Sequence, residues 1–278
     1  MSYNERAARE RAERFRAEHG LGARPLGDLF ELAHTALDVD ALAIDADGAE
    51  HGLSMLDPAT GRIAIAVATT PHPMRQRSSL AHEFGHVFGG DLDAATPTSP
   101  GARTAPEIQA DAFARHLLLP LQALRDRFGS GPAGTVGRVV GLADLAAVVQ
   151  EFEVSPKLAA IQFKEAGLID PATQDQWSTL TAGSLAARYG WLSQYQAMAA
   201  ASARPRAPQT LMRRAVEGYR RGVIGIDELA GWYGQRSEQL LEELGPPEPG
   251  IPAPRGDDDL DDEPLFPPGY LSTTPTVP

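Results

Sequence analysis

The sequence predicts an α+β fold, in which a small, mainly antiparallel sheet packs against helices and a helical C-terminal region follows. Three short apolar segments bounded by turn-forming residues, at 39–44, 51–56 and 62–68, have the length and composition of strands. Elsewhere the apolar residues recur every three or four positions, as in amphipathic helices. With 278 residues, of which 42% are hydrophobic, the chain can bury a substantial core in one domain or two.

Composition excludes several kinds of site. The chain has no cysteine, which rules out disulfides, cysteine-bound zinc and a cysteine nucleophile, and fits a reducing compartment. The first residues lack the basic-then-apolar pattern of a signal peptide, and no apolar run reaches the ~18 residues that span a membrane. A net charge of −12 disfavours a nucleic-acid binder. We therefore expect a cytoplasmic protein that does not enter the membrane.

Two helices are expected before the first strand. Residues 4–18 are strong helix formers with interleaved charges, which predicts a solvated helix that ends near Gly20. A basic DNA-binding arm is the alternative, but the acidic side chains offset the arginines. Residues 25–37 carry apolar side chains at helical spacing and predict an amphipathic helix that packs on the core.

The strand at 39–44 is followed by an expected hairpin. Its two strands, at 51–56 and 62–68, are joined by residues 57–61, whose Pro and Gly are typical of turns.

The helix expected after the hairpin contains the pattern His82-Glu83-x-x-His86. Positions four apart on a helix lie nearly above one another, so the two imidazoles point the same way, as two ligands of one metal ion must. Glu83 lies one step round the helix, where it can act as a general base. Apolar neighbours make this helix a buried one, and buried His and Glu side chains need a partner such as a metal ion.

A third metal ligand is expected from the segment that begins at Glu107. The segment reads as a second helix that ends before Pro120, with Glu107 and Asp111 four apart on one face. Glu107 can ligate the metal while Asp111 accepts the free ring N–H of a ligand histidine. His116 is about half a turn away from Glu107 round the same helix, so it is left out of the site.

Other assignments of the third ligand are weaker. The pattern HExxHxxGxxH fails because Leu92 occupies the position of its last histidine. Asp91 and Asp93, one residue to either side, are weaker candidate ligands. For Glu107 and Asp111 the alternative is an ordinary solvated acidic face.

The run Arg77–His86, followed by the run Glu107–Pro120, resembles the ImmA/IrrE family of metallopeptidases. The resemblance covers residues 20–170 well and extends more loosely to 245. It implies a zincin-like fold, in which the HExxH helix and the Glu107 helix pack on the small sheet. The family's zinc ligands correspond to His82, His86 and Glu107, and its catalytic base corresponds to Glu83.

The resemblance also implies a biological role, namely a cytoplasmic endopeptidase that cuts a helix-turn-helix repressor and so relieves repression. Two positions depart from the family pattern. Gly89–Asp91 stand where many members have a basic residue or a histidine, and Gln109 stands where an acid is common. Neither departure affects a proposed ligand.

The expected chemistry is metal-assisted hydrolysis of a peptide bond. Three protein ligands leave one position on zinc open to water, and Glu83 takes a proton from that water and later passes it to the leaving amine. Manganese is the alternative metal. Zinc peptidases commonly take the substrate as an added strand at a sheet edge near the active helix. Residues 62–68, which directly precede that helix, are expected to form this edge.

The segment Leu142–Ile161 reads as a helix, a tight turn and a second helix, with Ser155 as the N-cap of the second. If it bound DNA, the second helix would offer Lys157, Gln162 and Lys164 to the groove. These cations are too few to favour direct DNA binding, so docking of a substrate or packing beside the peptidase core is preferred.

Five parts of the chain are expected. They are a charged N-terminal helix at 1–20, a zincin-like metallopeptidase domain at 21–135, a helix-turn-helix-like helical region at 136–202, a small C-terminal helical module at 203–245 and a disordered tail at 246–278. The tail is rich in proline and in acidic residues, a composition that cannot bury a core.

Two alternatives of another functional class are left open. In the first, the protein is a transcription regulator whose metal site is structural or sensory. In the second, it is a toxin/antitoxin-type protein that works by binding a partner without cutting it.

Overall fold

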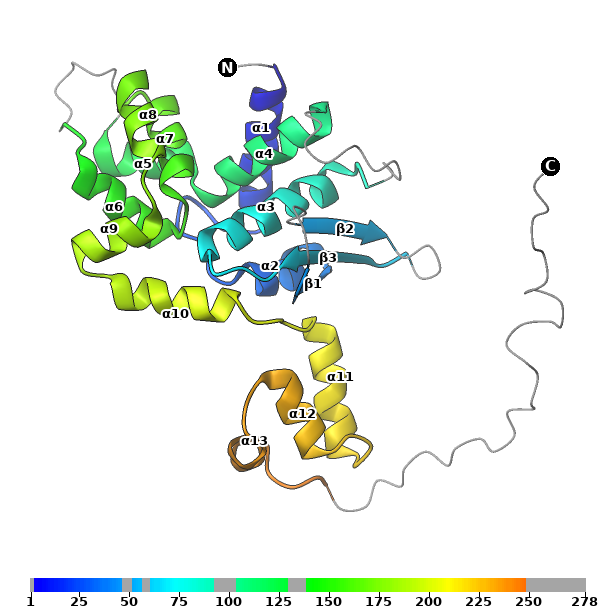
Figure 1. Ribbon diagram of the computed structural model, residues 1–278. Helices are drawn as coiled ribbons and strands as arrows, with labels where there is room; N and C mark the ends of the chain where they lie inside the picture. The colour runs from blue at the N-terminus through cyan, green and yellow to red at the C-terminus, as the bar shows by residue number, and fades with distance from the viewer. Residues whose placement is uncertain (1–2, 47–51, 57–60, 93–103, 130–138, 249–278) are drawn as a thin grey trace, which may run out of the picture. The chain divides into compact units, whose positions relative to one another are not determined.

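The computed structural model describes residues 3–46, 52–56, 61–92, 104–129 and 139–248. The chain forms two compact units, residues 1–212 and residues 213–278. In the first unit a three-stranded sheet lies beside a group of helices (Figure 1), which confirms the α+β fold class.

The strands are β1 (Asp40–Ile44), β2 (Gly52–Leu56) and β3 (Ile63–Ala68). The helices of the first unit are α1 (Tyr3–Glu18), α2 (Leu29–Leu37), α3 (Pro73–Gly89), α4 (Ala105–Leu118), α5 (Leu121–Phe128), α6 (Leu142–Phe152), α7 (Pro156–Glu165), α8 (Pro171–Ser178), α9 (Ala182–Tyr189) and α10 (Leu192–Ser202). Helix α11 (Gln209–Arg220) crosses the boundary, and α12 (Ile226–Tyr233) and α13 (Ser237–Leu244) belong to the second unit. None of the described helices has the length and apolar character needed to cross a membrane.

The sheet has the order β1-β3-β2, with β3 in the centre. Strands β2 and β3 pair antiparallel, which confirms the expected hairpin, whereas β1 and β3 pair parallel. The sheet is therefore mixed rather than mainly antiparallel. The reason is topological, because β1 and β2 lie on opposite edges and the hairpin returns β3 between them.

The open edge of the sheet is not the one expected. Because β3 has a partner on each side, the expectation that residues 62–68 form the edge is wrong. The edge of β1 is also covered, since the backbone N–H and C=O groups of Ala43 exchange hydrogen bonds of 2.9 Å with Arg206. The Arg206 guanidinium forms a 2.6 Å ion pair with Asp28 and lies 4.4 Å from the ring centre of Phe30. Among the described residues, β2 is thus the strand whose outer edge has no partner strand.

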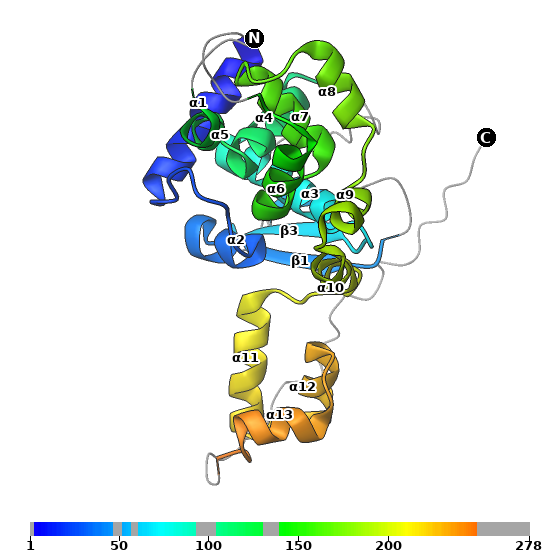
Figure 2. The same ribbon diagram turned by 90° about the vertical axis from the view of Figure 1, so that its left-hand side faces the viewer.

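One face of the sheet packs against α3. Ile65 and Val67 of β3 pair with Ala41 and Ala43 of β1, and all four side chains are buried, as the two-residue period of a strand requires for a covered face. Helix α3 contacts both β2 and β3 and lies between the sheet and α4 (Figure 2). The sheet and α4 together hold α3 from two sides.

The N-terminal helix α1 is not the solvated helix that its charges predict. Ala8, Ala12 and Phe15 are buried against α4, because they recur at helical spacing among the charged residues. Arg16 is also buried, and its guanidinium donates hydrogen bonds of 2.8 and 2.6 Å to the backbone oxygen of Leu117. Helix α1 therefore packs against α4 and stabilises its C-terminal end.

The predicted helix–turn–helix segment consists of α6 and α7. Ser155 is the N-cap of α7, as expected, and its hydroxyl accepts a hydrogen bond of 3.1 Å from the backbone N–H of Leu158. Gln162, one of the three residues considered for DNA contact, is fully buried and donates to the backbone oxygen of Leu119 at 2.6 Å. Helix α7 is thus part of the core, and only Lys157 and Lys164 of that trio face solvent.

The second unit has a small apolar core of its own, made of Ala215, Tyr219, Leu229, Ala230 and Leu240. The Tyr219 hydroxyl donates a 2.7 Å hydrogen bond to the backbone oxygen of Gly245 and so ties α11 to the end of α13. Most of the tail expected to be disordered, residues 249–278, lies outside the described residues.

Candidate metal centre

Helix α3 carries His82 and His86 on one side. Pro73 begins the helix at a position where no N–H donor is needed. Gly90 ends it in the left-handed conformation, with φ of 71°, and its N–H bonds the backbone oxygen of Val87 at 3.2 Å. Phe84, on another side, is fully buried and anchors the helix in the core.

Helix α4 brings a carboxylate up to these histidines. Thr104 caps its N-terminus, and its hydroxyl accepts from the backbone N–H of Glu107 at 3.5 Å. The two helices approach closely at Gly85, where an added Cβ would lie 3.0 Å from the Cα of Ala110. This small contact allows Glu107, one turn before Ala110, to reach the histidines.

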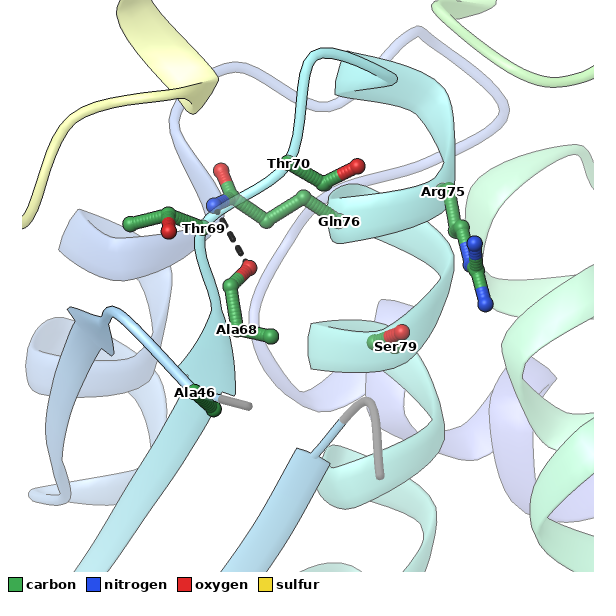
Figure 3. Close-up of a pocket in the computed structure, with 7 residues that line it drawn as sticks. All are labelled: Ala46, Ala68, Thr69, Thr70, Arg75, Gln76 and Ser79. Atoms are coloured by element: carbon green, nitrogen blue, oxygen red, sulfur yellow. Dashed lines mark hydrogen bonds between the residues drawn. The ribbon is translucent and has the colours of Figure 1, made fainter. Parts of the chain in front are cut away.

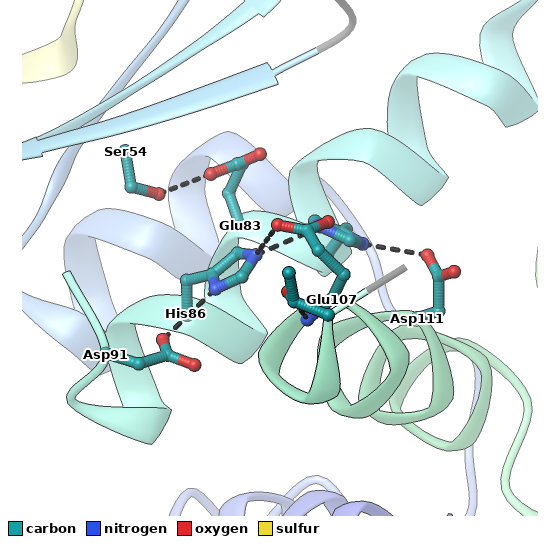
Figure 4. Close-up of polar contacts among 8 residues, drawn as sticks. Ser54, Glu83, His86, Asp91, Glu107 and Asp111 are labelled. Carbon is teal, nitrogen blue, oxygen red and sulfur yellow. Dashed lines mark hydrogen bonds and ion pairs between the residues drawn. The ribbon is translucent and has the colours of Figure 1, made fainter. Parts of the chain in front are cut away.

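The three predicted ligands meet at one point (Figure 4). The Nε2 atoms of His82 and His86 lie 3.1 Å apart. The Glu107 carboxylate places one oxygen 3.2 Å from Nε2 of His82 and the other 3.6 Å from Nε2 of His86. Zinc with tetrahedral bonds of about 2.0–2.1 Å needs ligand atoms about 3.3–3.4 Å apart, close to these separations.

The other nitrogen of each ring determines what the site can bind. Nδ1 of His82 lies 2.9 Å from Asp111, and Nδ1 of His86 lies 3.1 Å from Asp91. An ionised carboxylate can only accept, so both Nδ1 atoms are donors, and in the neutral rings both Nε2 atoms carry lone pairs. Two lone pairs and a carboxylate then face one another without a proton between them. This donor set fits a divalent cation.

Asp111 lies where the sequence places it, beside the ring of a predicted ligand. Asp91 was considered a weak candidate ligand, but it contacts Nδ1 of His86 and not the Nε2 atom that faces Glu107. Its approach depends on the left-handed turn at Gly90, which folds the chain back onto α3. Asp93 lies outside the described residues.

The electrostatic surroundings of His82 favour positive charge. Burial lowers the pKa of His82, but the hydrogen bond to Asp111 and the negative charges of the surrounding carboxylates outweigh burial and raise the pKa above its ordinary value. A site that stabilises a proton on the ring in this way also stabilises a cation placed among the same groups.

Glu83 lies beside the three ligand atoms and contacts strand β2. Its side chain is 7% exposed, and its Oε2 atom accepts a 2.6 Å hydrogen bond from the hydroxyl of Ser54. Gly52 lies on the same face of β2 and comes close to the other carboxylate oxygen. No sequence pattern singles out Ser54 or Gly52, because strand pairing and helix packing bring them to Glu83.

A cavity of about 110 Å³ lies at the N-terminal end of α3 (Figure 3). It is lined by Ala46, Ala68, Thr69, Thr70, Arg75, Gln76 and Ser79. Gln76 closes one side by donating hydrogen bonds of 3.1 and 3.0 Å to the backbone oxygens of Ala68 and Ser202. Ser79, which lines this cavity, is one helical turn before Glu83 on α3.

His116, which the sequence leaves out of the site, is held elsewhere on α4. It is 2% exposed and lies against Gln162 and Glu165 of α7.

Comparison with known families agrees with this geometry. Residues 34–164 match the family model described as the IrrE N-terminal-like domain, a family of peptidases. The match confirms the resemblance to the ImmA/IrrE family over this part of the chain, which holds the sheet, α3 and α4, and it indicates a metallopeptidase. No curated protein matches the sequence.

Proposed function

We propose that the IrrE N-terminal-like domain of this chain is a zinc-dependent endopeptidase that cuts a helix-turn-helix transcriptional repressor. The observation that carries the peptidase activity is the cluster of His82, His86 and Glu107, whose ligand atoms meet at one point with Glu83 beside them (Figure 4). Two imidazoles and one carboxylate suit zinc, and they also accommodate manganese. The choice of repressor as substrate rests on the family resemblance.

The residues of the site would have three separate roles in hydrolysis: metal binding, orientation of the histidine rings and proton transfer. His82, His86 and Glu107 would hold the metal, which supplies Lewis acidity to a carbonyl oxygen and to water. Asp111 and Asp91 contact the Nδ1 atoms, which leaves both Nε2 atoms facing the Glu107 carboxylate, where the metal would bind. Glu83 accepts the proton of the attacking water and delivers it to the leaving amine, so that it serves as base and then as acid.

The open edge of β2 favours a substrate that binds in an extended conformation. An extended peptide can add to an unpaired strand edge through backbone hydrogen bonds. Strand β2 offers that edge. It also packs against α3, and its residue Ser54 contacts Glu83. The substrate would therefore present a segment without regular structure, such as an exposed loop or linker of the repressor.

The test is cleavage by the zinc-loaded full-length protein. It would be incubated with a mixture of proteome-derived peptides and with purified helix-turn-helix repressors, and new termini would be identified by mass spectrometry. We expect cleavage by the wild type and a loss of about 10²–10⁴-fold in Glu83→Gln, which keeps the metal ligands but removes the base. Glu31→Gln, an exposed glutamate on α2, is the matched control.

The outcomes separate the functional classes. Cleavage of peptides but of no repressor would overturn the choice of substrate and leave the peptidase. A stable complex with a repressor that persists without cleavage, and is unchanged in Glu83→Gln, would favour a partner-binding protein with a structural or sensory metal.

A further inference from the structure

We propose that Ser54 and Gly52 of strand β2 form a seat that positions the carboxylate of Glu83. This inference rests on the proposed function, because it gives Glu83 the part of the general base. Ser54 and Gly52 are positioning residues, since they contact Glu83 and not the reacting atoms.

The hydrogen bond from Ser54 has a defined direction. The hydroxyl lies 2.6 Å from Oε2 of Glu83, and an ionised carboxylate can only accept, so Ser54 is the donor. A short bond between a hydroxyl and a charged carboxylate is among the stronger hydrogen bonds in proteins. Because Glu83 is 7% exposed, few water molecules can replace that donor when it is lost.

Gly52 leaves the space in which the carboxylate lies. A Cβ added at this position would lie 2.7 Å from Oε1, 3.1 Å from Cγ and 3.2 Å from Cδ of Glu83. Any larger residue would therefore push the carboxylate away from β2. Together, the absent side chain of Gly52 and the hydroxyl of Ser54 determine both where the carboxylate lies and how it is turned.

The pattern of the strand supports this assignment. Residues 52 and 54 project from one face of β2, whereas Leu53 projects from the other face and is 53% exposed. A glutamate side chain has several rotatable bonds, and helix α3 fixes only its Cα and Cβ. Strand β2 supplies the remaining constraint, and its outer edge is the one that a substrate strand would join. Strand β2 would thus fix the position of the base relative to the scissile bond of a substrate paired with its outer edge.

The first experiment measures binding and does not need a substrate. Acetohydroxamate chelates a catalytic metal and gives its hydroxyl proton to a neighbouring base. Its dissociation constant would be measured by calorimetry on zinc-loaded full-length variants. We expect Ser54→Ala to weaken binding about 10–100-fold, because the carboxylate is then no longer held where it can take the proton of the hydroxamate. Ser54→Thr retains the hydroxyl and should stay within about threefold of the wild type.

Gly52→Ala tests the space rather than the hydrogen bond. Its Cβ would displace the carboxylate, so we expect a loss of affinity at least as large as that of Ser54→Ala. The matched controls lie far from the site in sequence. Ser178→Ala removes a hydroxyl that donates to the backbone oxygen of Gln174 within α8, and Gly231→Ala adds a Cβ with no close neighbour within 4 Å in the described part of the chain. Neither control should change the binding of acetohydroxamate.

The second experiment uses a peptide that the wild type cuts. Loss of positioning should lower kcat in Ser54→Ala with little change in KM, and Ser54→Thr should restore kcat. If the wild type binds acetohydroxamate but cuts no peptide, the proposed function fails, while the binding series still decides the role of Ser54.

Two results would contradict the proposed role of Ser54 and Gly52. One is unchanged acetohydroxamate binding in both Ser54→Ala and Gly52→Ala. The other is loss of zinc in those variants, because the contact would then support the fold of the metal site and not the placement of the base.

Discussion

Two histidine–carboxylate clusters share helix α4, and they have opposite chemistry. Near its N-terminus, Glu107 meets His82 and His86 of α3. Near its C-terminus, His116 meets Glu165 of α7, with Nε2 and Oε2 3.5 Å apart. Both clusters contain imidazole and carboxylate, yet only the first brings together the group of ligand atoms that can hold a metal ion in the described part of the chain.

The difference lies at the second ring nitrogen. In His82 and His86, Nδ1 faces a carboxylate and carries the proton, which frees Nε2 for a metal. In His116, Nδ1 lies 3.2 Å from the side-chain nitrogen of Gln162, which can only donate. The proton of the neutral His116 ring is therefore on Nε2, the ring nitrogen nearer to Glu165, and this nitrogen is not available as a metal ligand.

Burial reinforces the contrast. Burial, helped by nearby arginines, lowers the pKa of His116 to about 3, so the ring is neutral at physiological pH. Burial likewise raises the pKa of Glu165 to about 7, although Arg115 opposes this. The second cluster is thus a buried contact that joins α4 to α7. In both clusters, the hydrogen bonds at the second ring nitrogen decide the role of the histidine.

The largest expected effect is on zinc affinity. His82→Ala removes one ligand and should weaken zinc binding at least about 100-fold, since each ligand carries some 3 kcal/mol of a total of about 10–16 kcal/mol. His116→Asn keeps an acceptor toward Gln162 and should bind zinc like the wild type. Competition with a chromophoric chelator measures both. Equal affinities for the two variants would abolish the distinction between the clusters.

A smaller effect is expected when the orienting carboxylates are removed. Asp111→Ala and Asp91→Ala should each weaken zinc binding about tenfold, because the rings lose the partner that fixes the proton on Nδ1. Asp111→Asn keeps an oxygen acceptor and should lose less. Asp175→Ala, an exposed aspartate on α8, is the control in the same competition assay. Wild-type affinity in both alanine variants would show that the ring orientation is set elsewhere.

The smallest effect concerns the second cluster and the dependence of stability on pH. Because the pKa of His116 is lowered to about 3 in the folded state, the unfolded state binds the proton more tightly, and folding stability contributed by neutral His116 is lost as pH falls below about 6.5. His116→Asn lacks this loss. Its deficit in unfolding free energy relative to the wild type should shrink by about 1–2 kcal/mol between pH 7 and pH 5.

Urea unfolding at several pH values measures this difference. Glu165 acts in the opposite sense, since its raised pKa of about 7 means that stability falls as pH rises from about 4.5 through 7. Glu165→Gln should remove that part of the pH dependence. A deficit of His116→Asn that does not change with pH would contradict a buried neutral histidine.

Local periodicity determined much of this protein from the sequence alone. Helical spacing put His82 above His86 and Glu107 above Asp111, because the geometry of a helix turn depends on neighbouring residues only. The hairpin of β2 and β3 and the cap at Ser155 were predicted for the same reason, since turn and cap chemistry acts over a few residues.

Tertiary structure alone decided the features that join distant segments. Strand order placed β3 in the centre and left β2 open, which no local pattern encodes. The packing of α3 on β2 brought Ser54 and Gly52 to Glu83, about thirty positions along the chain, and the packing of α4 on α7 turned His116 into a core residue. Spacing along one helix fixes which residues share a side of that helix. Which element packs against that side depends on contacts between distant segments, and the local sequence of a helix or strand does not determine those contacts.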